Sequence, residues 1–208
     1  MESNWAAENL QVIRTLMERS AVYRRALAPV MLTAGVIGSG AAIGAWAGKI
    51  SSPRGFIAYW MAVAIVALLA SLVLVRRQAL REGEPFWSPP TRRVTRAFVP
   101  PLFVGLVVGP LSSSGAGFEC VQPWALPALW MLLYGCALHA AGFFMVRGIR
   151  LFGWIFLLCG GALLAGCFVA SATPSPRFSH LIMGLAFGGL HLAYGIYLYF
   201  TERSRKSA

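Results

Sequence analysis

Aspartate is absent from this chain of 208 residues, and all seven acidic residues are glutamate. Charged residues amount to only 12% of the composition, against about 25% in typical soluble proteins. The four cysteines include no CxxC pair, which argues against disulfide redox chemistry. The sequence also lacks an HExxH zinc motif, a P-loop and the paired glutamates of the CPBP membrane proteases. These absences favour a non-enzymatic protein.

Hydrophobic residues dominate what is present. They make up 58% of the chain, and the mean hydropathy is +0.67, which excludes a soluble domain, a disordered chain and a small disulfide-rich scaffold. A bilayer core about 30 Å thick requires about 20 apolar residues in each crossing helix. Six stretches meet or approach that length, and together they predict an all-α membrane bundle over residues 27–200: 27–48, 55–75, 97–114, 124–146, 150–171 and 178–200.

The basic residues indicate how this bundle lies in the membrane. Fifteen of the 18 lysines and arginines fall in the segments that precede span one, join spans two to three and four to five, and follow span six. Only Lys49, Arg54 and Arg177 fall on the other side. Cytoplasmic loops carry the excess of basic residues, so both termini are predicted to be cytoplasmic. A charge arranged in this way suits anionic lipid headgroups, and nucleic acid is not an expected partner.

Besides the short turn between spans four and five, three segments are predicted to lie in the cytoplasm. Residues 1–26 include an amphipathic helix, over 4–27, that can lie in the headgroup plane or dock on a partner. The loop 76–96 is basic, and its prolines prevent one continuous helix. Residues 201–208 form a basic tail.

Small residues repeat at four-residue spacing in several spans. Gly40, Gly44 and Gly48 form such a series in span one, and Gly184 and Gly188 form one in span six. Small residues at this spacing let two helix backbones approach closely. Packing within the bundle is the simplest interpretation, and a homodimer through span one is the alternative.

The histidines within the spans are the most informative polar groups. Side chains of this kind are costly at bilayer depth and usually face the bundle interior. Helix geometry places His139 and His191 at a similar depth, so they could meet if spans four and six are neighbours. The sequence around Tyr134 in span four faintly resembles that around Tyr194 in span six.

Two interpretations of these histidines remain open. Each imidazole can bond a carbonyl, a tyrosine or a buried water. Alternatively, both can line an apolar-ligand pocket between spans four and six, together with Tyr134, Tyr194 and Cys136. A haem or metal would need further ligands beyond Cys136, so no metal ligand and no cofactor are assigned.

Six spans with serines and histidines raise the hypothesis of a hydrolase, because rhomboid proteases pair a Gly-x-Ser-Gly serine with a histidine on their sixth span. The run Ser112–Gly115 lacks the first glycine, and His180 falls at the outer edge of its span. A catalytic motif counts only in its structural context, so this interpretation is disfavoured.

The stretches Glu8–Arg19 and Glu84–Pro89 resemble an uncharacterised bacterial family of integral-membrane proteins with six spans. The resemblance covers most of the chain and implies a location in the bacterial inner membrane. The family has no established activity, so it carries over no catalytic residue.

The leading functional hypothesis is therefore a small membrane sensor or interaction protein, with segments 4–27 and 76–96 as its output surfaces toward a cytoplasmic protein. The alternative is a passive transporter or carrier of a small or lipid-like substrate. A haem- or metal-binding membrane protein is the third interpretation.

Overall fold

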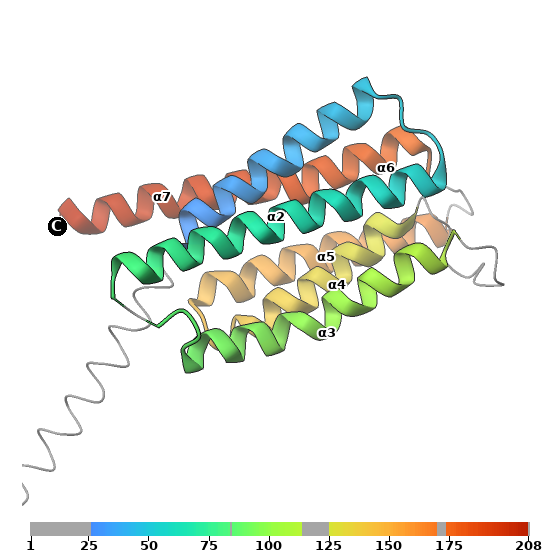
Figure 1. Ribbon diagram of the computed structural model, residues 1–208. Helices are drawn as coiled ribbons and strands as arrows, with labels where there is room; N and C mark the ends of the chain where they lie inside the picture. The colour runs from blue at the N-terminus through green and yellow to red at the C-terminus, as the bar shows by residue number, and fades with distance from the viewer. Residues whose placement is uncertain (1–25, 84, 114–124, 170–173, 208) are drawn as a thin grey trace, which may run out of the picture.

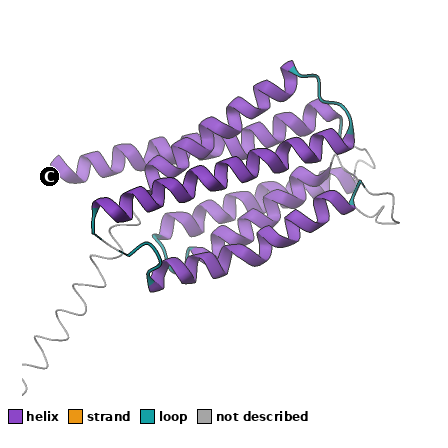
Figure 2. Cartoon of the chain, viewed as in Figure 1, coloured by secondary structure: helices purple, strands orange, loops and turns teal. Residues whose placement is uncertain are grey.

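The computed structural model describes residues 26–83, 85–113, 125–169 and 174–207, and these residues are all-helical apart from turns and connections (Figure 2). The amphipathic helix expected in residues 1–26 lies almost entirely outside them. The helices are Ala26–Ala47, α2 (Pro53–Arg81), α3 (Pro89–Leu111), α4 (Leu126–Ala141), α5 (Arg147–Val169), α6 (Pro176–Met183), the π-helix η2 (Gly184–Leu190) and α7 (His191–Ser207). The last three follow one another without a break.

Serine caps and prolines set the starts of two of these helices. The hydroxyl oxygens of Ser52 and Ser175 accept hydrogen bonds from the backbone N–H groups of Gly55 and Phe178, each at 3.2 Å. A proline follows each cap, where its missing N–H would have had no helical partner. The local sequence is therefore sufficient to begin α2 and α6.

Helix α3 starts earlier than the sequence indicated. It begins at Pro89 rather than near residue 97, and Pro100 and Pro101 lie inside it instead of opening it. The hydroxyls of Ser88 and Thr91 are 3.0 Å apart, and Thr91 donates to the carbonyl of Phe86 at 2.9 Å. This buried polar cluster organises the first turn. As a result, only residues 82–88 connect α2 to α3, and most of the expected loop 76–96 is helical.

Five helices are long and apolar enough to cross a membrane: Ala26–Ala47, Pro53–Arg81, Thr91–Leu111, Arg147–Cys167 and Pro176–Thr201. Large apolar side chains such as Val36, Ile65 and Leu158 are exposed on their surfaces, as expected for contact with lipid. Helix α4 is apolar but has 16 residues, because the chain turns at Gly142 before the predicted end at 146. The structure is thus a helical membrane bundle, and the sixth span remains a prediction.

The helices form two layers (Figure 1). Ala26–Ala47, α2 and the continuous helix α6–η2–α7 make one layer, and α3, α4 and α5 make the other. Glycines allow close backbone contact within each layer: a Cβ on Gly38 would lie 2.5 Å from the carbonyl oxygen of Phe187, and one on Gly135 would lie 2.9 Å from that of Gly153.

The glycines predicted for packing divide between two environments. Gly184 and Gly188 face the first helix, where added Cβ atoms would meet Ala42 and Ser39. A Cβ on Gly40 would meet nothing within 4 Å, and one on Gly44 would approach only the hydroxyl of Tyr59. One on Gly48 would meet only its own turn, at Gly44 and Ile50. The first helix therefore contacts the last through Gly35 and Gly38, which the four-residue series had not included.

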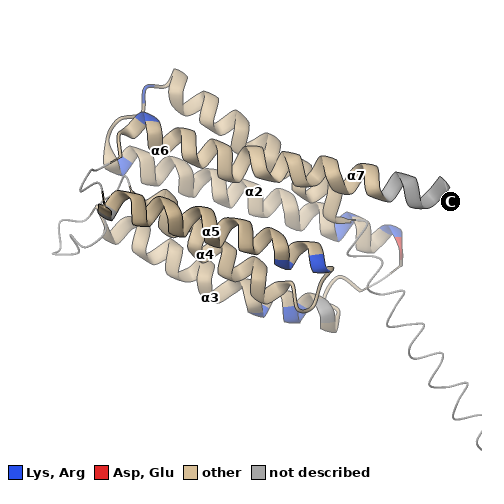
Figure 3. Cartoon of the chain, turned by 180° about the vertical axis from the view of Figure 1, so that it is seen from behind, with Lys and Arg blue, Asp and Glu red and all other residues tan. Residues whose placement is uncertain are grey.

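Basic residues mark the two ends of the bundle (Figure 3). The end of α2 and the starts of α3 and α5 lie together, and we call this the basic end. It carries Arg76, Arg77, Arg81, Arg92, Arg93, Arg96, Arg147 and Arg150. The opposite end carries Lys49, Arg54 and Arg177. The folded helices thus keep apart the two groups of charges that the sequence had separated.

Candidate functional site

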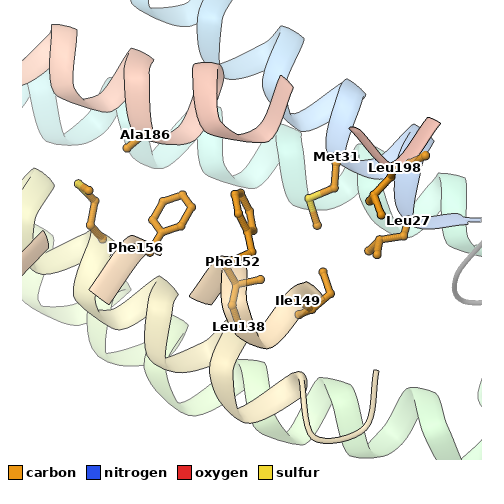
Figure 4. Close-up of a cluster of buried hydrophobic side chains, with 10 residues drawn as sticks. Leu27, Met31, Leu138, Ile149, Phe152, Phe156, Ala186 and Leu198 are labelled. Carbon is orange, nitrogen blue, oxygen red and sulfur yellow. The ribbon is translucent and has the colours of Figure 1, made fainter. Parts of the chain in front are cut away.

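Aromatic side chains fill the space between the two layers. Tyr134 of α4 and Phe152 and Phe156 of α5 face Phe187 of η2 and His191 at the start of α7, and we call these five residues the aromatic seam. Figure 4 shows Phe152 and Phe156 extending from α5 toward the last helix. Whereas glycines bring backbones together within a layer, ring contacts join the two layers here, at centroid distances of 5.3–5.6 Å.

His191 lies at the centre of the seam and is only 2% exposed. Its ring centroid is 5.3 Å from that of Phe152, 5.6 Å from that of Phe156 and 6.3 Å from that of Phe187. Apolar rings thus surround an imidazole that must find its hydrogen-bond partners inside the protein.

The imidazole of His191 finds two partners. Its Nδ1 lies 3.4 Å from the carbonyl oxygen of Ala186, which can only accept, so Nδ1 carries the proton in the neutral ring. Nε2 then accepts a hydrogen bond from the hydroxyl of Tyr134 at 2.8 Å. This confirms, for His191, the interpretation in which tyrosine and a carbonyl satisfy the ring. It also makes spans four and six neighbours through Tyr134.

The π-helix η2 directly precedes His191 and shapes its environment. The backbone N–H of His191 donates to the carbonyl of Gly188, while its side chain reaches the carbonyl of Ala186, two residues further back. A π-helical turn is wider than an α-helical turn, and such segments often occur at functional sites. His191 thus links the wide turn of one layer to Tyr134 of the other.

Tyr194 extends the seam toward the basic end. Its ring stacks on Phe152 at a centroid distance of 4.6 Å with planes 14° apart. Its hydroxyl is buried beside Gly148 and has no hydrogen-bond partner in the described part of the chain. A buried hydroxyl without a partner is unusual, so Tyr194 offers the seam an unused donor.

His139 lies apart from His191. Its ring contacts Phe143 and Trp154, both at 5.4 Å, and its buried Nδ1 has no partner among the described residues. No ring contact or hydrogen bond between described residues joins the two histidines. The residue of α4 that contacts His191 is Tyr134 and not His139. The side chains of Tyr134 and His139 leave α4 on different faces, so only one of them can face His191.

The described cysteines lie outside the seam. Cys136 and Cys159 are exposed, and Cys167 is half-buried. Cys136 therefore does not accompany the buried His191 as a ligand. Among the residues that the structure describes, no three His, Cys, Asp or Glu side chains gather where they could hold a metal ion.

His180 forms a second polar contact, near the opposite end of the bundle. The indole N–H of Trp60 donates to its Nδ1 at 3.0 Å, and its Nε2–H donates to the carbonyl of Ile50 at 3.0 Å. Phe56 packs edge-on against the ring at 4.9 Å. Both ring nitrogens are engaged, so no lone pair is available for a general base. Ser114, the other residue that a hydrolase would use, lies outside the described residues.

Sequence reasoning did not single out Phe152, Phe156, Phe187 or the Trp60–His180 contact. The i, i+4 spacing of Phe152 and Phe156 on one face of α5 is a signal that could have indicated the seam. Trp60 carries no comparable signal, because its partner lies 120 residues away in the chain.

Comparisons of this chain with known protein families, with curated proteins and with solved structures found no match.

Proposed function

We propose that this chain is a non-enzymatic membrane protein of the sensor or interaction type, in which an apolar ligand is recognised at the aromatic seam. The hydrogen bond between Tyr134 and His191 carries this proposal. It joins the two layers, and it is surrounded by rings that a flat or branched apolar molecule can contact. A ligand that enters between the layers would replace this bond and change how the layers fit together.

The other interpretations have less support. His180 is fully hydrogen-bonded, which gives a hydrolase no free base. A passive carrier would need a path past His191, where four aromatic rings now pack. Haem or metal would require ligands that the described residues do not bring together.

The proposed sensor has both termini in the cytoplasm of a bacterial cell and lies in the inner membrane. The unequal distribution of arginine supports this orientation. A cytoplasmic protein would then bind segments 4–27 and 76–96 and respond to a change in the conformation of the bundle. A homodimer through the first helix would use the face around Gly40, whose Cα is open to contact.

Ligand recognition can be tested with the full chain purified in mild detergent. Organic extraction and mass spectrometry should find an apolar compound enriched with the wild type and lost with the double variant Tyr134→Phe/His191→Phe. The variant Trp60→Phe changes an aromatic contact outside the seam and should retain the compound. Identical extracts from all three proteins would contradict recognition at the seam.

The output role needs a separate experiment. Deletion of residues 1–20 should abolish capture of a cytoplasmic partner without changing the amount of protein in the membrane. If partner capture and any downstream response are both unchanged, segment 4–27 is not the output surface of the proposed sensor.

A further inference from the structure

The start of α5 concentrates positive charge within a single helical turn. Arg147 and Arg150 occupy its first turn, and no acidic residue lies in that turn. A helix N-terminus already carries about half a positive charge from its aligned peptide dipoles, so cations are unfavourable there. Helix α3 begins at the same end with Arg92 and Arg93 and likewise has no acidic residue in its first turn. An anion bound at this end would offset the positive charge at the starts of both helices.

The side chain of Arg150 is held in place at this surface. Its guanidinium carbon lies 5.3 Å from the ring centroid of Phe143, in a cation–π contact. Phe143 is 64% exposed, and the backbone of Arg150 packs against Gly142, where an added Cβ would come within 2.8 Å. The cation is therefore oriented by an aromatic ring at the outer surface of the bundle.

Trp154 continues the same face of α5 toward the middle of the membrane. Arg147, Arg150 and Trp154 follow i, i+3 and i+7 spacing, which places them on one side of a helix. The indole of Trp154 is 48% exposed and packs edge-on against His139 at 5.4 Å. Its N–H has no acceptor in the described part of the chain, although a donor at this depth seeks a polar partner.

Apolar side chains follow these polar groups along α5. Leu151, Ile155 and Leu158 have i, i+4 and i+7 spacing and are 63%, 43% and 65% exposed. Along one helix, the surface thus presents two arginines and then an indole donor, with an apolar track beside them. This order matches the phosphate, ester carbonyl and acyl chain of a phospholipid.

We propose that the start of α5 is a binding site for an anionic phospholipid, beyond the general attraction of a basic surface to a bilayer. Arg147 and Arg150 bind the phosphate, which would lie at the positive end of the helix dipole. Trp154 donates to an ester carbonyl, and Leu151, Ile155 and Leu158 contact an acyl chain. The site is independent of the aromatic seam, so it stands whether or not the seam binds a ligand.

Native mass spectrometry of the full chain in detergent tests this site. The protein is titrated with phosphatidylglycerol and with phosphatidylcholine of the same acyl chains. We expect retained phosphatidylglycerol adducts and a lower occupancy for phosphatidylcholine. The double variant Arg147→Gln/Arg150→Gln should weaken phosphatidylglycerol binding by about fivefold for each arginine removed.

A matched double variant controls for net charge. Lys49→Gln/Arg177→Gln removes two charges at the opposite end and should bind phosphatidylglycerol like the wild type. Phe143→Leu retains every charge but releases Arg150, so we expect a partial loss. All variants are compared only after size-exclusion chromatography and circular dichroism show a folded protein, and Phe143→Leu provides the test if the double variant does not fold.

Several results would overturn the site. These are equal retention of the two lipids, unchanged binding by the arginine double variant, or an equal loss in the control variant. Inorganic phosphate is added in a final arm. If phosphate at the lipid's concentration displaces phosphatidylglycerol, the surface binds a free anion and the lipid assignment is wrong.

Discussion

The hydroxyl of Tyr134 lies 2.8 Å from Nε2 of His191, although 57 residues separate the two in the chain. Tyr134 belongs to the layer formed by α3–α5, and His191 belongs to the layer that contains the first and last helices. Their hydrogen bond is therefore a polar contact between two parts of the bundle that otherwise meet here through aromatic rings.

Removal of this hydroxyl should destabilise the bundle. Tyr134→Phe leaves the ring contacts in place and deprives Nε2 of its donor, so we expect the free energy of unfolding to fall by about 1 kcal/mol. Equilibrium unfolding in mixed micelles measures the change. Tyr199→Phe on the exposed side of α7 is the control. In a double-mutant cycle, His191→Phe should show coupling with Tyr134→Phe, and strict additivity would contradict the bond.

Two glycines of the first helix provide a matched pair. Gly38→Ala should destabilise the protein by about 1–3 kcal/mol, because its Cβ would come within 2.5 Å of the carbonyl oxygen of Phe187. Gly40→Ala should be tolerated, because its Cβ would meet nothing within 4 Å. Thermal denaturation of both variants in detergent checks this. An equal loss in Gly40→Ala would contradict this difference in packing between the two glycines.

The contact between Trp60 and His180 should matter for the opposite end of the bundle. Trp60→Phe leaves Nδ1 of His180 buried without a donor, at a cost of about 1–3 kcal/mol. The rate of amide hydrogen exchange in this variant should rise at the starts of α2 and α6, near this contact. Trp46→Phe, at a position 74% exposed, should leave exchange unchanged. If the two variants behave alike, the hydrogen bond does not stabilise this end.

The orientation in the membrane can be tested with introduced cysteines. In a variant without its native cysteines, Lys49→Cys should react with an impermeant maleimide in intact cells, because it lies at the opposite end. Arg81→Cys at the basic end should react only after the membrane is permeabilised, since basic residues are retained on the cytoplasmic side. The reverse pattern would contradict the proposed topology.

Several features of the fold follow from the sequence alone. Apolar stretches of nearly 20 residues locate the helices, since backbone groups within a bilayer must bond internally. The expected span 27–48 agrees closely with the helix Ala26–Ala47, and 178–200 lies within Pro176–Ser207. The boundaries of α3 and α4 were wrong because they depend on the polar cluster at Ser88 and on the turn at Gly142. Hydropathy does not register either contact.

The candidate site was predicted only in part. His191, Tyr134 and Tyr194 were identified because polar groups are conspicuous in an apolar span, and the structure places all three along the interface between the layers. Phe152, Phe156 and Phe187 were missed because aromatic residues are common in membrane helices and their sequence does not say which of them face inward.

Composition and the order of residues determined that this chain is a helical membrane protein with most of its described arginines at one end, because both properties depend on local sums of hydropathy and charge. Only the tertiary structure decided that His191 meets Tyr134 rather than His139, and that Gly38 rather than Gly40 packs against the last helix. Those choices depend on the rotation of each helix about its axis, which is set by the fit of side chains from segments far apart in the chain.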